Sequence, residues 1–191
     1  MKTTLIAAAI AALTATTAYS APEKFTLDAS HSQIVFSYNH LGFSTTWGMF
    51  SGFAGDIMFD ADAPDASSVT VSMPLKSMFT GWEKRTAHFM GPDFFDANDD
   101  SKVSFTSTAI EVTGDATAKI TGDLTIGSVT KSVVLDAVLN QSGDHPMAGK
   151  PWMGFNGTTT LLRSDFDAGE FAPFVGDEVD VMISIEAMKA E

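Results

Sequence analysis

The chain has 191 residues, a formal net charge of −13 and no cysteine, and 45% of its residues are apolar. That length suits one domain or at most two very small ones, and the apolar content is enough for a core, which argues against global disorder. With 24 acidic against 11 basic residues, nucleic-acid binding is close to excluded, because phosphate binding needs a basic surface. The absence of cysteine excludes disulfides, thiol catalysis and thiolate metal sites.

Residues 1–20 have the pattern of a secretory signal peptide. A positive start with Lys2 is followed by an apolar run over residues 5–13, and the small residues Ala18 and Ser20 precede a cleavage point before Ala21. A retained N-terminal anchor is the alternative, but the run is shorter than the roughly 20 apolar residues that span a bilayer. We therefore predict that residues 1–20 are removed, and that residues 21–191 form a single domain of 171 residues with a net charge of −14 in the periplasm.

Alternation of apolar and polar residues dominates the rest of the chain. In chain order it covers residues 32–40, 48–60, 69–75, 103–107, 120–126, 133–139, 155–161 and 179–185. The intervening positions are mostly Ser, Thr, Asp, Asn and Lys, as in half-buried antiparallel strands, and turn signals such as Gly114-Asp115 separate the segments. About eight such strands predict an all-β fold, an eight-stranded antiparallel barrel that is either filled by side chains or holds one small ligand.

Two segments depart from this alternation. The step from Phe50 to Phe53 is odd-numbered, so a bulge near Ser51-Gly52 is expected to restore the phase within one strand. Residues 81–90 (GWEKRTAHFM) contain good helix formers and no alternation, which predicts a short helix or lid beside the barrel.

A soluble barrel and an outer-membrane barrel both have one apolar and one polar face, so alternation alone does not separate them. Three features favour the soluble form. The chain ends in Met188-Lys-Ala-Glu191 without a terminal aromatic residue, the polar faces are rich in Ser, Thr and single charges, and the apolar faces carry closely spaced Phe, which suits a lined cavity.

Seven short motifs occur in order between Phe25 and Glu186. They are Asp28-Ala-Ser-His-Ser-Gln-Ile-Val-Phe with His40-Leu-Gly-Phe-Ser, Gly48-Met-Phe50 with Phe53-Ala-Gly55, Pro92-Asp-Phe-Phe-Asp96, Val103-Ser-Phe-Thr-Ser107, Ile120-Thr-Gly-Asp-Leu-Thr125 with Val129-Thr-Lys131, Arg163-Ser-Asp-Phe166 and Val175-Gly-Asp-Glu-Val179. In this order they resemble the YceI-like family of lipocalin-like periplasmic polyisoprenoid-binding proteins. The sequence departs from the family pattern at residues 85–89, where Arg-Thr-Ala-His-Phe replaces Arg-Asp-x-His-Leu, and at Gly127-Ser128, where a polar residue such as His is common. The chemistry around a head group can therefore differ.

The resemblance implies an eight-stranded barrel around a long apolar tunnel that binds an isoprenoid chain, such as a polyprenyl phosphate or a quinone. Ten residues on the apolar faces are predicted to bind the tail: Phe36, Tyr38, Phe50, Phe53, Ile57, Phe59, Met73, Phe105, Leu124 and Phe155. Aromatic rings offer flat walls, and each buried CH₂ contributes about 0.8 kcal/mol, so a tail of a few isoprene units binds by burial alone. Gly48, Gly55, Gly122 and Gly157 are expected to keep the lumen open. Without the resemblance, the same Phe residues would fit a filled barrel core.

Six further residues are predicted at the mouth, around a head group: His40, Trp82, Arg85, His88, Phe89 and Arg163. In a helix over residues 81–90, Arg85, His88 and Phe89 share one face by their i, i+3 and i+4 spacing. Arg85 and Arg163 are the only arginines, and a guanidinium suits a diphosphate or a quinone oxygen. The alternative is that each arginine pairs with a surface acid.

No catalytic or metal site is predicted. The sequence has no H-x-H, HExxH or G-x-S-x-G motif and no recognisable His–carboxylate triad, and acidic pairs such as Asp99-Asp100 fit solvated turns. We therefore expect a carrier without enzyme activity that needs no cofactor and binds an isoprenoid lipid or quinone as its ligand. Two alternatives stay open: a quinone-linked redox accessory protein or enzyme, and a structural or partner-binding barrel with a filled core. A homodimer and a membrane redox or lipid-handling partner stay open as well.

Overall fold

The computed structural model describes residues 21–191, and the predicted signal peptide over residues 1–20 lies outside the described residues. The described part contains ten strands: β1 (Glu23–Leu27), β2 (Gln33–His40), β3 (Ser44–Phe50), β4 (Ala54–Phe59), β5 (Ser68–Pro74), β6 (Lys102–Gly114), β7 (Thr117–Ile126), β8 (Val129–Asp144), β9 (Pro151–Leu162) and β10 (Glu178–Lys189). It also contains the helix α1 (Glu83–Phe89) and three short 3-10 turns, η1 (Pro64–Ala66), η2 (Leu75–Ser77) and η3 (Arg163–Phe166). Within this part of the chain, no helix has the length and apolar character needed to cross a membrane.

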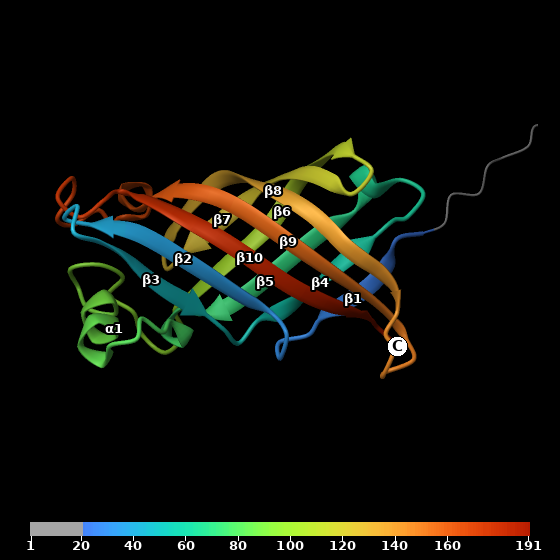
Figure 1. The fold of residues 1–191 in the computed structure, drawn as a ribbon, viewed down its shortest axis with the longest axis horizontal. Helices are drawn as coiled ribbons and strands as arrows, with labels where there is room; N and C mark the ends of the chain where they lie inside the picture. The colour runs from blue at the N-terminus through green and yellow to red at the C-terminus, as the bar shows by residue number, and fades with distance from the viewer. Residues whose placement is uncertain (1–20) are drawn as a thin grey trace, which may run out of the picture.

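The strands form a closed antiparallel barrel (Figure 1). Hydrogen-bonded pairing runs in the order β1, β4, β5, β6, β7, β8, β9, β10, and β10 returns to β1, so eight strands complete the ring. The hairpin β2–β3 extends from β10 and projects, together with α1, at one end of the barrel (Figure 1). Both the eight-stranded antiparallel barrel and the short helix within residues 81–90 are therefore confirmed.

The junction between the hairpin and the ring explains the odd-numbered step in the apolar pattern. β10 pairs with β2 over Asp180–Ser184 and with β1 over Ala187–Lys189. Likewise, β3 pairs with β2, whereas β4 pairs with β1 and β5. Residues 51–53 belong to neither β3 nor β4, and Gly52 adopts a φ of 72°, which favours glycine. The predicted bulge within one strand is therefore wrong: the phase changes because the chain leaves the hairpin and joins the ring.

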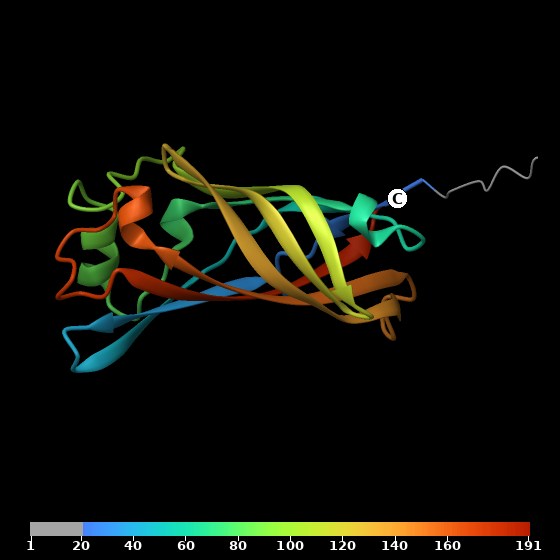
Figure 2. The ribbon, with the colours of Figure 1, turned by 90° about the horizontal axis from the view of Figure 1, so that it is seen from above.

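Burial along the strands shows that the barrel is hollow. In β8 the inward positions Val133, Leu135, Ala137 and Leu139 are only half-buried, and the residues between them are exposed. Side chains that met across a filled core would be fully buried. Buried apolar residues instead form two clusters: Phe25, Leu27, Phe53, Ile57, Met73, Leu75, Val103, Met153 and Ala187 in one, and Phe36, Tyr38 and Met78 in the other. Seen from above, the strands wrap around an elongated barrel with α1 at one end (Figure 2).

Candidate functional site

A cavity of about 1450 Å³ occupies the barrel interior. Its lining residues come from strands β2 to β10, from α1 and from the loops at both ends, and most of them are apolar. The cavity reaches from Trp82 and Phe171 at the α1 end to Pro64 and Asp115 at the opposite end. Pockets for drug-sized ligands measure about 300–1,000 Å³, so this space suits a longer apolar molecule. The alternative of a filled core is therefore wrong for the described residues.

All ten residues predicted to bind the tail lie on the wall of this cavity. Six are buried, namely Phe36, Tyr38, Phe53, Ile57, Met73 and Phe105, and four are half-buried, namely Phe50, Phe59, Leu124 and Phe155. The alternation placed them on the inward face because side chains of a strand return to the same face every second residue. Their contact with a ligand stays a prediction.

The glycines of the wall do not all act as the sequence suggested. A Cβ at Gly48 would clash with the ring of its cross-strand partner Phe36, and one at Gly122 would clash with a second Phe ring. The missing side chains let these rings lie against the wall, so both glycines keep the lumen open indirectly, by seating aromatic rings. A Cβ at Gly55 would clash with the backbone of β5, and its role is the close approach of two strands. Gly157 lines the cavity directly, as expected, and the expectation is wrong for Gly55.

The six residues predicted at the mouth line the cavity at its α1 end. His40 ends β2, Trp82 precedes α1, Arg85, His88 and Phe89 lie on α1, and Arg163 opens η3. The helix turns Arg85, His88 and Phe89 toward the cavity, in agreement with their spacing. Arg85 Nη1 donates to the carbonyl oxygen of Thr80 at 3.1 Å, and its guanidinium carbon lies 5.8 Å from the centroid of the Trp82 ring. That these six residues bind a head group stays a prediction.

Aromatic rings join α1 to the loops around it. Phe94 contacts the rings of Phe89, His88 and Phe171, with ring centroids 5.0, 5.1 and 6.1 Å away. The first two pairs are edge-to-face, an arrangement that aromatic rings favour. His88 Nε2 also lies 2.9 Å from Asp93 Oδ2, on the loop that follows the helix. The helix, the loop after it and the loop after η3 thus meet at this mouth of the cavity.

Arg163 has a structural role that the sequence did not reveal. Its guanidinium donates four hydrogen bonds of 2.6 to 3.1 Å to backbone carbonyl oxygens within residues 168–176. These bonds hold the loop between η3 and β10, and burial lowers the pKa of Arg163 below its ordinary value. Neither Arg163 nor Arg85 has a carboxylate within ion-pair distance among the described residues, so the alternative of surface ion pairs is wrong. Four of the five guanidinium N–H groups of Arg163 are used in these hydrogen bonds.

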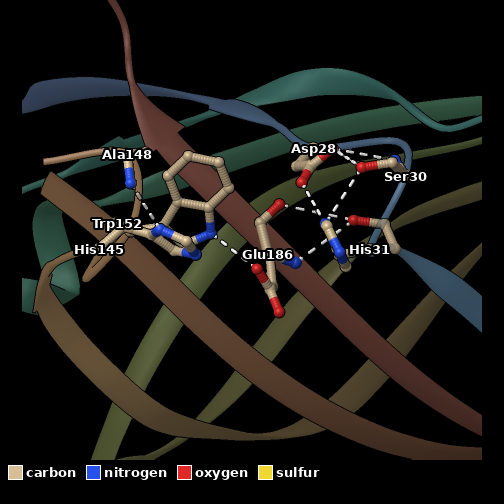
Figure 3. Close-up of polar contacts among 8 residues, drawn as sticks. Asp28, Ser30, His31, His145, Ala148, Trp152 and Glu186 are labelled. Carbon is tan, nitrogen blue, oxygen red and sulfur yellow. Dashed lines mark hydrogen bonds and ion pairs between the residues drawn. The ribbon is translucent and has the colours of Figure 1, made fainter. Parts of the chain in front are cut away.

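A polar cluster on the outside of the barrel escaped the sequence analysis (Figure 3). Asp28 and His31 lie in the β1–β2 connection and Glu186 lies on β10, and one oxygen or ring nitrogen of each is within 4.8 Å of the others. His31 Nδ1 is 2.7 Å from Asp28 Oδ2, and Trp152 Nε1 donates to Glu186 Oε2 at 2.8 Å. The expectation that no His–carboxylate triad occurs is therefore wrong. Only the spacing of Asp28 and His31 could have signalled it, because Glu186 lies near the other end of the chain.

Hydrogen bonds within this cluster set its electrostatics. The hydrogen bond with Asp28 raises the pKa of His31 above its ordinary value. Burial opposes ionisation of Asp28, but hydrogen bonds from Ser30 and His31 outweigh it and lower the pKa of Asp28. Neither these residues nor Glu186 line the cavity. Asp28 N donates to the backbone carbonyl oxygen of Glu186 at 2.8 Å, so the cluster attaches the β1–β2 connection to β10.

A closed antiparallel barrel that encloses an apolar cavity, with a short helix beside one mouth, places the protein in the class of lipocalin-like barrels. Within that class, the model of the YceI-like domain matches residues 25–187. The chain belongs to the YceI-like family, as the ordered motifs indicated.

Relatives match this chain over most of its length. A UPF0312 protein of Ectopseudomonas mendocina is 38% identical over 159 residues, which cover 83% of this chain and 83% of that protein. A UPF0312 protein of Pseudomonas savastanoi pv. phaseolicola is 36% identical and covers 99% of this chain and 98% of its own length.

Solved structures share the fold. The YCEI protein of Campylobacter jejuni matches with a TM-score of 0.71 and 29% identity, over 80% of this chain and 90% of that chain. BcnA of Burkholderia cenocepacia matches with a TM-score of 0.75 and 24% identity, over 84% and 98%. A polyisoprenoid binding domain from Saccharophagus degradans, implicated in plant cell wall breakdown, matches with a TM-score of 0.66 and 12% identity, over 87% and 98%. At the last two identities the likeness shows the fold alone.

Proposed function

We propose that the protein is a carrier or store that sequesters an isoprenoid lipid, of the polyprenyl phosphate or quinone type, inside the barrel. It acts in the periplasm, after removal of residues 1–20. The observation that carries the proposal is the apolar cavity of about 1450 Å³ along the barrel. The description of the Saccharophagus degradans domain, which shares this fold, as polyisoprenoid binding is consistent with the ligand class.

The cavity wall fits a branched hydrocarbon tail. Flat Phe rings and aliphatic side chains line it, and each CH₂ that leaves water contributes about 0.8 kcal/mol. Among the described residues, no buried side-chain nitrogen or oxygen lacks a hydrogen-bond partner. The barrel therefore buries no side-chain nitrogen or oxygen at the cost of a lost hydrogen bond. Binding through burial alone tolerates tails of different lengths.

The head group lies at the α1 end in this proposal, because the arginine, lysine and histidine side chains that line the cavity lie there. Arg85 lines the cavity and uses one N–H on Thr80, and His40 and His88 line the same end. A guanidinium can donate two parallel hydrogen bonds to a phosphate, or polarise a quinone oxygen. Arg163 is less available, because its donors hold the neighbouring loop.

Lipid analysis of the purified protein tests the proposal. The full chain is expressed with residues 1–20, recovered from the periplasmic fraction, and analysed by native mass spectrometry and by solvent extraction. We expect a mature chain that begins at Ala21 and carries an isoprenoid. A protein that is recovered without lipid, and that also fails to bind added ubiquinone and polyprenyl phosphate, overturns the proposal.

Two neighbouring residues of β8 give a matched pair of variants. Ala137 lines the cavity, whereas Val138 does not line it and is 41% exposed. Ala137→Phe is expected to fill part of the lumen and to weaken lipid binding by about tenfold, which corresponds to about 1.4 kcal/mol. Val138→Phe leaves binding unchanged, and circular dichroism checks that both variants fold. Equal loss of lipid in the two variants contradicts binding inside the barrel.

A further inference from the structure

Exposed aromatic and aliphatic side chains surround the mouth of the cavity at the α1 end. We call them the rim: Leu41, Phe43, Trp47, Phe79, Trp82, Phe171 and Phe174. Phe43 is 91% exposed and Phe174 is 76% exposed, although a water-facing surface gains nothing from such residues. The rim comes from three segments, the hairpin β2–β3, the stretch before α1 and the loop after η3, which Figures 1 and 2 show at the same end of the barrel.

Backbone hydrogen bonds hold the three segments of the rim together. Leu41 N donates to the carbonyl oxygen of Phe174 at 3.1 Å, which joins the hairpin to the loop after η3. Met49 and Phe79 exchange two backbone hydrogen bonds of 2.9 and 2.8 Å, which join the hairpin to the stretch before α1. The rim is therefore one surface, in which separate loops present their apolar side chains outward in fixed positions.

The hairpin that carries part of the rim has no charge. Residues 29–55 contain no Asp, Glu, Lys or Arg, in a chain with 24 acidic and 11 basic residues. An acidic body is repelled by anionic lipid head groups, whereas the uncharged hairpin, which carries Phe43 and Trp47, is compatible with a zwitterionic interface. Trp side chains are characteristic of the boundary between lipid head groups and acyl chains, and the rim contains two of the three Trp residues.

The rim is continuous with the interior of the barrel. Leu41, Trp82, Phe171 and Phe174 line the cavity and are also exposed to solvent. An isoprenoid that crossed water between a bilayer and the cavity would expose its tail, at a cost of about 0.8 kcal/mol for each CH₂. A mouth that touches the bilayer removes that cost, because the tail then passes from one apolar phase to another.

We propose that the rim is a membrane-docking surface that enters the head-group region of a zwitterionic bilayer while lipid passes between the bilayer and the cavity. This inference rests on the proposed function and adds the bilayer as the partner with which the protein exchanges lipid. A bilayer requires no complementary shape, which suits side chains that project from three separate segments. A second copy of the chain would instead need a matching surface, and its binding is an outcome that the experiment separates.

Quenching of tryptophan fluorescence tests the docking, because the three Trp residues report on different places. Trp47 and Trp82 belong to the rim, whereas Trp152 lies at the start of β9 and bonds to Glu186. Three variants each keep one Trp and carry Phe at the other two positions. With phosphatidylcholine vesicles that have brominated acyl chains, we expect quenching of Trp47 and Trp82 and none of Trp152. Equal quenching of all three, or quenching of Trp152 alone, overturns the proposal.

Vesicle binding of surface variants provides the second measurement. Phe43 and Phe79 belong to the rim without lining the cavity, so the double variant Phe43→Ser/Phe79→Ser leaves the lipid site intact. It is expected to bind phosphatidylcholine vesicles at least about tenfold more weakly in co-sedimentation. The matched control is Met147→Ser, because Met147 is also 91% exposed but lies in the β8–β9 turn at the opposite end.

The outcomes separate this inference from the function on which it rests. A protein that carries an isoprenoid, yet shows no vesicle binding and no rim quenching, keeps the proposed function and overturns the docking. A dimer in light scattering that Phe43→Ser/Phe79→Ser converts to a monomer, without rim quenching, overturns it in favour of a contact between copies. Loss of vesicle binding in Met147→Ser to the same extent contradicts a docking site at the rim.

Discussion

The α1 end of the barrel and the opposite end are held in different ways. At the α1 end, Arg163 and a chain of aromatic rings fix long loops through contacts that are distant in sequence. At the opposite end, hydrogen bonds within each short turn hold that turn. Asp60 Oδ1 accepts hydrogen bonds from the backbone N–H groups of Asp62 and Ala63, both at 3.0 Å. His145 Nδ1 likewise accepts hydrogen bonds from the backbone N–H groups that follow it in the β8–β9 turn.

The same contrast appears in the cavity. Its lining at the opposite end includes small and polar residues, such as Ser67, Ser68, Asp115, Thr117 and Ser142, and at the α1 end it is mainly aromatic. Local turns close a strand connection with few residues, whereas a wide apolar mouth needs long loops and therefore needs long-range contacts. The difference fits the proposed exchange of lipid with an apolar phase at the α1 end.

The largest effect is expected at Arg163. Arg163→Ala removes four hydrogen bonds from one loop and should lower the free energy of unfolding by about 3 kcal/mol, since charged donors contribute more than neutral ones. Arg85→Ala removes one such bond at the same end and should cost about 1 kcal/mol. Urea unfolding of both variants measures the difference. Equal losses of unfolding free energy in the two variants would show that the four hydrogen bonds of Arg163 do not hold the α1 end. The contrast between the two ends of the barrel would then fail.

A smaller effect is expected in the wall between the two ends. In Gly122→Ala the new Cβ clashes with the ring of Phe105 and with the backbone of β6, so overpacking should lower the free energy of unfolding by about 1–3 kcal/mol. The displaced ring should also reduce lipid loading. Gly154→Ala on β9 is the control, because nothing lies within 4 Å of its Cβ, and its stability should change by less than about 0.5 kcal/mol. If both variants behave alike in thermal unfolding, Gly122 does not seat Phe105.

The smallest effect is expected at the Asp28–His31 pair, because the His31 side chain is largely exposed. Because its pKa is raised above 6.5, His31 stabilises the fold fully below about pH 6.5, and this contribution is lost as the pH rises through the raised value. Because its pKa is lowered below 3.8, Asp28 stabilises the fold above about pH 3.8, and this contribution is lost as the pH falls through the lowered value.

Denaturant unfolding from pH 5 to 9 checks this prediction. Wild type should lose stability relative to His31→Gln as the pH rises, because the variant lacks the titrating ring. Parallel pH profiles of the two proteins would mean that the hydrogen bond between His31 and Asp28 contributes nothing at this end of the barrel.

The sequence predicted the parts of the molecule that follow a period of two. Inward residues from Phe36 to Phe155 lie on the cavity wall because strand geometry fixes the face of every second residue. β1 was missed, since its five residues are too few to establish a period. The phase change at residues 51–53 was recognised, but its cause, a change of strand partner, depends on β10 and left no local signal.

The parts that depend on the backbone of distant loops could not be predicted. Arg163 was recognised as a candidate for the mouth, but no residue pattern reveals that carbonyl oxygens of residues 168–176 surround it. The rings that fill the space above Gly48 and Gly122 were equally hidden, because the sequence does not show which side chain covers a glycine. For the same reason the contact of Asp28 and His31 with Glu186 required the fold.

The outer edge of β3 has a consequence for the range of guests. In the described part of the chain this edge makes a single backbone bridge, the two hydrogen bonds between Met49 and Phe79. Each such bond contributes about 0.5–1.5 kcal/mol, so opening the bridge costs little compared with breaking a ladder of the ring. Opening the bridge would increase the perimeter at this end while all eight strands of the ring stay paired, so we expect the proposed carrier to accept molecules of different girth.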